Sequence, residues 1–169
     1  MSKLVISATI TSFFFGLFGV DWGAVDQKIE NEFPQVSFVS TTELNQLYRS
    51  GESLPVIIDV REEEEFQVSH LEQALNIKTG IEAAQQIPDK NAEIIVYCSV
   101  GYRSANVAAQ LESLGYTKVR NLRHSIFEWA NKGYPMSNAG GDTAKAHPFN
   151  RAWGKLLNQN LHQYDAVTP

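Results

Sequence analysis

The chain has 169 residues, enough for one domain with extensions at its ends. It is 43% hydrophobic and 20% charged, which is ordinary for a globular domain and excludes a disordered chain. The formal net charge of −5 argues against a nucleic-acid partner, since a phosphate backbone calls for a basic surface.

The N-terminal residues 1–20 contain an apolar run. Residues 4–20 carry no charge and follow Lys3, a pattern typical of secretory signals and of short membrane anchors. The run falls slightly short of the roughly 20 residues that a spanning helix needs. A cleaved signal and a retained anchor both stay open, beside an apolar helix packed in the fold. The first two place the rest of the chain in a periplasm or an equivalent extracytoplasmic compartment, either secreted or held at the membrane.

The elements expected next lead into the main domain. Residues 21–35 are polar and are expected to form a linker. A short strand over 36–39 is followed by a helix, because Ser40 and Glu43 have the spacing of a capping box. Gly51 marks the end of that helix.

Strands alternate with helices through the middle of the chain. Residues 56–60 form an apolar run, broken only by Asp59, of the kind found in buried parallel strands, and residues 93–97 are expected to form a second central strand. Shorter strands are expected over 75–77 and 119–122, and helices over 61–68, 81–87, 104–114 and 126–132. This alternation indicates βαβ units and therefore an α/β fold with a parallel sheet covered on both faces. The domain is placed at 36–136.

Residues 137–169 are expected to form a linker and an amphipathic helix. Apolar side chains recur there at helical spacing, namely Phe149, Trp153, Leu156, Leu157, Leu161 and Tyr164. We expect this helix to fold back onto the domain. A helix that binds a partner or a membrane surface is the alternative.

The single cysteine, Cys98, is the most informative residue. One thiol can form neither an intrachain disulfide nor a thiolate-rich zinc site, and we predict no metal and no cofactor. Cys98 lies between a buried strand and a helix, at the edge of a parallel sheet where ligands bind. Backbone N–H groups of the turn at Gly101, the helix N-terminus and the Arg103 charge all favour a thiolate. We therefore expect a lowered pKa at Cys98.

The segment Cys98-Ser-Val-Gly-Tyr-Arg-Ser104 resembles the active-site loop of the rhodaneses, Cys-x-x-Gly-x-Arg-Ser/Thr. Residues 59–77 resemble the upstream Asp-Val-Arg…Glu-Phe…Asn-Ile motif of that family, and residues 122–135 resemble its downstream Trp…Gly-Tyr-Pro motif. The resemblance covers about 36–136. It implies a central, mostly parallel five-stranded sheet with helices on both faces, and sulfurtransferase activity.

The resemblance also implies a mechanism. The Cys98 thiolate takes a sulfane sulfur from thiosulfate or a related anionic donor and passes it, as a persulfide, to cyanide or an external thiol. Arg103 orients the donor and stabilises the leaving sulfite. The remaining loop residues, Ser99, Val100, Gly101, Tyr102 and Ser104, bind the substrate.

Supporting roles are assigned in the same way. Asp59 is expected to brace the loop and Arg61 to lie near the pocket rim, with an ion pair that only stabilises the fold as the alternative. His70 is expected to stabilise a turn. The acidic run 62–65 is interpreted as a solvated helix face, with Phe66 turned inward.

The chain departs from the family pattern at two places. His124 and Ser125 stand where the family has Gly-Gly, so their side chains are expected to narrow the pocket or add a donor to it. Ser69 and Gln73 replace glycines of the upstream motif, which bears on turn geometry more than on chemistry.

Two other functions are weighed against sulfur transfer. Phosphatases and arsenate reductases of this fold carry Cys-x5-Arg, whereas four residues separate Cys98 from Arg103, and Tyr97 occupies the place of a phosphatase histidine. A persulfide carrier or binding module that serves a partner protein is the stronger alternative. It stays open because no second cysteine can resolve the persulfide within the chain.

Overall fold

The computed structural model describes residues 20–167. The predicted signal or anchor lies outside these residues apart from Val20, so it stays a prediction. Between residues 20 and 167 there is no helix that combines the length and the apolar character needed to cross a membrane.

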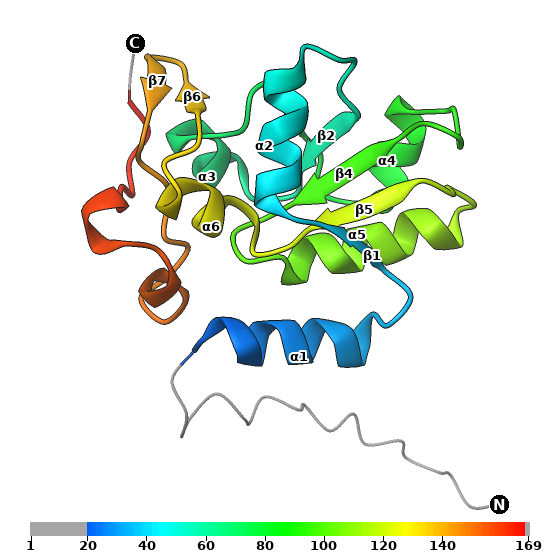
Figure 1. The fold of residues 1–169 in the computed structure, drawn as a ribbon, viewed down its shortest axis with the longest axis horizontal. Coiled ribbons are helices and arrows are strands. Elements are labelled where there is room, and N and C mark those ends of the chain that lie inside the picture. The colour runs from blue at the N-terminus through cyan, green and yellow to red at the C-terminus, as the bar shows by residue number, and fades with distance from the viewer. Residues whose placement is uncertain (1–19, 168–169) are drawn as a thin grey trace, which may run out of the picture.

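A parallel sheet forms the centre of the molecule (Figure 1). It has five strands in the order β1-β5-β4-β2-β3: β1 (Ser37–Val39), β2 (Val56–Asp59), β3 (Leu75–Asn76), β4 (Ile94–Tyr97) and β5 (Val119–Leu122). Every neighbouring pair in this sheet is parallel. The central strand β4 is buried along its whole length, as its continuous apolar sequence predicts. The predicted α/β fold is confirmed.

Five helices connect the strands: α2 (Thr41–Ser50), α3 (Glu63–Val68), α4 (Gly80–Gln86), α5 (Tyr102–Ser113) and α6 (Ser125–Asn131). The predicted capping box of α2 is present, and Gly51 ends that helix in the left-handed conformation. Alternate strand residues bury in two apolar clusters, with Ile57 and Ile95 in one and Ile58 and Val96 in the other. The sheet is thus covered on both faces, as expected from the period of two along a strand.

The predicted linker over 21–35 is wrong, because α1 (Trp22–Glu32) occupies most of it. The Asp21 carboxylate accepts a hydrogen bond from the Ala24 N–H and caps the helix. Val25 and Ile29, one turn apart, are buried in the same cluster as the residues of β4 and α5. Two buried apolar positions in an otherwise polar segment give only a weak helical pattern in the sequence. Packing of these two side chains against the domain is what stabilises the helix. Figure 1 shows α1 running along α5.

The predicted C-terminal linker and amphipathic helix are also wrong. The expected linker forms an antiparallel hairpin of β6 (Met136–Asn138) and β7 (Gly141–Thr143). From there to residue 167, the last that the structure describes, the chain makes two short 3₁₀ turns, η1 (Trp153–Leu156) and η2 (Gln159–Leu161), and no α-helix.

Side-chain and strand-like contacts replace the helical hydrogen bonds in this segment. The Asn131 amide donates to the Leu156 carbonyl at 2.8 Å and accepts from the Asn158 N–H at 2.8 Å. Ala146 pairs with η2, since its N–H donates to the Leu161 carbonyl at 2.9 Å. The apolar stripe therefore divides: Leu156 and Leu157 are buried, whereas Phe149 and Tyr164 are exposed.

We predict that Ile29→Ala lowers the free energy of unfolding by about 2–4 kcal/mol, because it leaves a cavity beneath the sheet edge where α1 packs. Urea denaturation followed by circular dichroism measures this. Gln27→Ala is the matched control, since Gln27 is exposed on the same helix and should change stability by less than about 0.5 kcal/mol. Equal, small effects of the two substitutions would show that α1 is only loosely attached.

Candidate active site

Cys98 stands at the carboxyl end of β4, and the loop that follows turns sharply at Gly101. Gly101 has φ 107°, and a Cβ there would lie 3.5 Å from Ile29 Cδ1 and from the Leu122 carbonyl. A side chain would be strained in this conformation. The Asn121 amide donates to the Gly101 carbonyl at 2.8 Å and fixes the turn. Helix α5 begins at the next residue, two residues earlier than the sequence predicts.

The Cys98 sulfur is buried and receives hydrogen bonds. The Gly101 N–H donates to Sγ at 3.1 Å, and the Ser104 hydroxyl donates at 3.5 Å. Burial by itself raises the pKa of the thiol, but the Arg103 charge and the donors of Ser104 and Gly101 outweigh it. The pKa of Cys98 is therefore lowered, in the predicted direction, so these contacts favour ionisation of the buried thiol.

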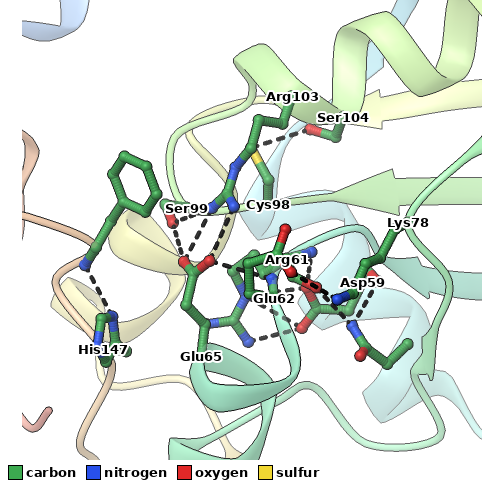
Figure 2. Close-up of polar contacts among 12 residues, drawn as sticks. Asp59, Arg61, Glu62, Glu65, Lys78, Cys98, Ser99, Arg103, Ser104 and His147 are labelled. Atoms are coloured by element: carbon green, nitrogen blue, oxygen red, sulfur yellow. Dashed lines mark hydrogen bonds and ion pairs between the residues drawn. The ribbon is translucent and has the colours of Figure 1, made fainter.

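Arg103 is held by a carboxylate that the sequence analysis placed in solvent. Its Nη1 and Nη2 donate to the two oxygens of Glu65 at 2.8 and 2.9 Å, and Nη2 also donates to Ser99 Oγ at 2.9 Å (Figure 2). The Ser99 hydroxyl donates to Glu65 at 3.0 Å and closes the triangle. This bidentate geometry suits a guanidinium and a carboxylate.

Glu65 corrects the interpretation of residues 62–65 as a solvated face. Glu62, Glu63 and Glu64 are exposed, but Glu65 is buried. Burial raises the pKa of the Glu65 carboxyl. The hydrogen bonds and charge of Arg103, together with the charge of Arg61, lower this pKa by more than burial raises it. The net shift is downward. No periodic signal separates this residue from its three neighbours, so sequence reasoning missed it.

Asp59 and Arg61 form a fully buried ion pair. Arg61 Nε donates to Asp59 Oδ1 at 2.9 Å, and its Nη2 donates to Asp59 Oδ2 and to the Ser69 carbonyl, each at 2.6 Å. The expectation that Arg61 lies at a pocket rim is wrong, because its side chain has no exposed area. Within residues 20–167, the Asp59 carboxylate accepts hydrogen bonds from the backbone and side chain of Arg61. These contacts favour the second expectation for Asp59 and Arg61, that the ion pair only stabilises the fold.

His70 occupies a turn. Its backbone exchanges two hydrogen bonds with Ser137, and its Nδ1 lies 3.0 Å from the Phe66 carbonyl. The ring stacks on Phe66 with the centroids 3.9 Å apart. Phe66 is half-buried rather than turned into the core, since it covers His70. The contacts of His70 agree with the predicted turn-stabilising role.

His124 and Ser125 adopt the left-handed backbone conformation, with φ 59° and 47°, which explains why glycines fit these positions. The His124 ring packs against Trp22 of α1 in a tilted arrangement, with the ring centroids 4.3 Å apart, and its Nε2 lies 3.1 Å from Asp26 Oδ1. His124 thus faces α1 and does not narrow the pocket. Gln73, at another family glycine, has φ 60° for the same reason.

The Ser125 side chain contacts the backbone of the active-site loop at Cys98. Its hydroxyl accepts the Cys98 N–H at 3.1 Å and donates to the Leu122 carbonyl at 3.0 Å. It therefore supports the backbone of Cys98 and adds no donor to the pocket, contrary to expectation.

Two loop residues predicted to bind substrate face α1. Val100 is buried in the cluster that contains Val25 and Ile29. The Tyr102 hydroxyl donates to Glu32, and Lys28 lies over its ring, 4.8 Å from the centroid. These contacts fix the shape of the loop, and only Ser99, Gly101 and Ser104 of the predicted loop set touch the sulfur or the Glu65–Arg103 pair.

The C-terminal segment supplies further neighbours that the sequence analysis missed. The Phe149 ring lies over the Arg103 guanidinium, with the centroid 4.7 Å from Cζ. The Phe149 N–H donates to His147 Nδ1 at 3.1 Å. More than forty residues separate this segment from the loop, so local patterns carry no signal of the contact. In the part of the chain that the structure describes, no cluster of His, Cys, Asp and Glu is arranged to hold a metal ion.

A buried cysteine at the end of a central parallel strand, with the Gly101 N–H bonded to its sulfur and an arginine five residues on whose charge lowers its pKa, defines a rhodanese-type site. The model of the rhodanese-like domain family matches residues 40–132, over half of the chain, and the chain belongs to this family.

Among its relatives, the thiosulfate sulfurtransferase PspE of Escherichia coli is 39% identical over 77 residues, which are 41% of this chain and 74% of PspE. The tRNA uridine(34) hydroxylase of an Enterobacter species is 26% identical over 86% of this chain, but the chain spans only 44% of that protein. The solved thiosulfate sulfurtransferase of Pseudomonas aeruginosa shares the fold, with a TM-score of 0.59 and 21% identity over 80% of this chain and 26% of that one.

We predict that Glu65→Gln lowers the free energy of unfolding at pH 7 by about 1–3 kcal/mol. The substitution removes the buried carboxylate that pairs with Arg103, and the partial exposure of Arg103 limits the loss. The lowered pKa means that ionised Glu65 stabilises the fold above the ordinary carboxyl pKa of about 4.3. That contribution disappears as the pH falls through the lowered value. Urea titrations at pH 7 and at acidic pH should therefore show the two proteins converging in acid. A difference that does not depend on pH would contradict an ionised Glu65.

Proposed function

We propose that this protein is a sulfurtransferase in which Cys98 carries a sulfane sulfur from thiosulfate or a related donor to a thiol or to cyanide. The observation that carries the proposal is the Cys98 Sγ itself, buried, with a lowered pKa, and within 3.1 Å of the Gly101 N–H. Family membership supports the class of reaction, and PspE supports thiosulfate as the donor to be tested first.

In the first half-reaction the Cys98 thiolate attacks the outer sulfur of thiosulfate. A bond forms between Sγ and that sulfur, the sulfur–sulfur bond of thiosulfate breaks, and sulfite leaves with the electron pair. Arg103 lies beside the sulfur and stabilises negative charge there, both on the thiolate and on the departing anion. Glu65 and Ser99 keep the guanidinium in place.

In the second half-reaction an external nucleophile removes the sulfur. The acceptor attacks the outer sulfur of the persulfide, and the electron pair of the broken bond returns to Cys98 as a thiolate. The acceptor is external because the chain has one cysteine. A persulfide carrier for a partner protein uses the same loading step and differs in the second, so acceptor turnover separates the two functions.

We predict that thiosulfate adds one sulfur atom to the protein at Cys98 and that cyanide removes it as thiocyanate. Mass spectrometry of the intact protein before and after each reagent measures both steps. Cys98→Ser should abolish the mass change and the thiocyanate, because an alcohol of ordinary pKa neither attacks nor retains sulfane sulfur. Full activity of Cys98→Ser would exclude Cys98 as the nucleophile, and loading without catalytic turnover would favour the carrier.

Arg103→Ala should slow the reaction with thiosulfate by about 100- to 1000-fold, the usual effect of losing one charge-assisted contact to a developing anion. The reaction with an uncharged donor such as dimethyl trisulfide, followed by the disappearance of the free Cys98 thiol, should slow much less. Arg49→Ala is the control, since Arg49 is exposed and lies on α2, away from the loop. Equal losses for the two donors would show that Arg103 acts through the Cys98 thiolate or the fold and does not contact the departing anion.

A further inference from the structure

An aromatic residue from outside the family domain lies at the mouth of the site. The family match ends at residue 132, and Phe149 follows in the C-terminal segment. Its ring covers one face of the Arg103 guanidinium at 4.7 Å, yet 41% of the residue remains exposed to solvent. The inner face of the ring thus contacts the site, and the outer part is free to meet a ligand.

The backbone holds Phe149 in this place against its own preference. Its φ of 63° is the left-handed conformation, which is unfavourable for a bulky residue. The Phe149 N–H donates to His147 Nδ1 at 3.1 Å, and the His147 ring packs edge-on against Tyr164 at 5.4 Å. Ala146, next to His147, is fully buried and hydrogen-bonded to η2. The chain immediately before Phe149 is therefore anchored, and it fixes the position of the ring.

The charges around Phe149 are already matched. Arg103 is paired with Glu65 and Arg61 with Asp59, so each guanidinium at this edge of the sheet faces a carboxylate. The exposed side chains of Glu62, Glu63 and Glu64 add negative charge on α3. Arg103 still acts on charge at the sulfur itself, but the part of an acceptor that lies beyond the reacting sulfur meets guanidinium groups that are already paired. An apolar skeleton there gains contact with the exposed Phe149 ring.

We propose that Phe149 is a specificity-determining residue that contacts the carbon skeleton of an organic thiol acceptor. The proposal rests on the sulfurtransferase function above. The acceptor thiolate forms a bond with the outer sulfur of the Cys98 persulfide, the bond from Sγ to that sulfur breaks, and its electron pair returns to Cys98. The product is an organic persulfide, and no further oxidant or reductant takes part. Thiols with an apolar or aromatic skeleton next to the sulfur are the preferred class.

The test compares two uncharged thiols and one small anion as acceptors in single-turnover reactions. Cys98 is loaded with inorganic polysulfide, so that donor preference does not enter, and the loss of the extra sulfur is followed by mass spectrometry. Benzyl mercaptan and 2-mercaptoethanol differ chiefly in the carbon skeleton, and cyanide has none. Wild type should prefer benzyl mercaptan, and Phe149→Ala should lower that preference by about tenfold, as expected for one lost apolar contact. Its rate with cyanide should change by less than about twofold.

Three variants separate a ring contact from a general disturbance of the segment. Phe149→Tyr keeps the ring and should keep the preference, and Phe149→Leu should give an intermediate value even if the alanine variant folds poorly. Tyr164→Ala removes another exposed aromatic residue that packs on His147 and not on Arg103, and it should leave the preference unchanged.

Several outcomes would overturn this inference. Equal slowing of all three acceptors in Phe149→Ala, or the same loss in Tyr164→Ala, would reduce Phe149 to a structural role while leaving the sulfurtransferase function intact. A wild-type protein with no preference for benzyl mercaptan would do the same. Failure of both polysulfide and thiosulfate to load Cys98 in the wild type would instead refute the sulfurtransferase function, and this proposal with it.

Discussion

A thiol that is buried at the end of β4 and must ionise to react is the constraint on which the rest of the site depends. Removal from water disfavours the charged sulfur, and only nearby positive charge and hydrogen-bond donors reverse that effect. Arg103 supplies the charge, and because its guanidinium is only partly exposed to water it needs a partner of its own, which the buried Glu65 carboxylate provides. The ion pair in turn ties α3 to the start of α5, so the chemistry of the sulfur fixes the packing of two helices.

Residues on both sides of the family domain reinforce this centre. On the N-terminal side, α1 packs Ile29 beneath Gly101 and holds Tyr102 and His124, so the outer side of the loop rests on a helix and not on water. On the C-terminal side, Phe149 covers Arg103. The site is therefore more enclosed than the matched residues 40–132 alone would make it.

Glycine replacements in this chain show how backbone strain is accommodated. Gln73, His124 and Ser125 adopt left-handed conformations at positions where the family motifs have glycine. At His124 and Ser125, side-chain contacts compensate for the backbone strain. The His124 side chain contacts α1, and the Ser125 hydroxyl accepts a hydrogen bond from the Cys98 N–H. Each contact offsets part of the roughly 1–3 kcal/mol that such a conformation costs. The same two side chains consequently position the loop instead of facing the substrate.

The sequence by itself determined the strands, the helices between them and the place of Cys98, because apolar runs, capping residues and the glycine turn are local signals. It also identified Arg103 and Ser104, which lie on the same short segment as the cysteine. Only the tertiary structure decided the roles of Glu65, Ser125 and Phe149, since each depends on a partner distant in the chain. The tertiary structure likewise decided that residues 22–32 form a helix, because packing of two buried residues stabilises an otherwise polar stretch. It also decided the conformation of the C-terminal segment, where side-chain hydrogen bonds and one left-handed residue replace a regular helix.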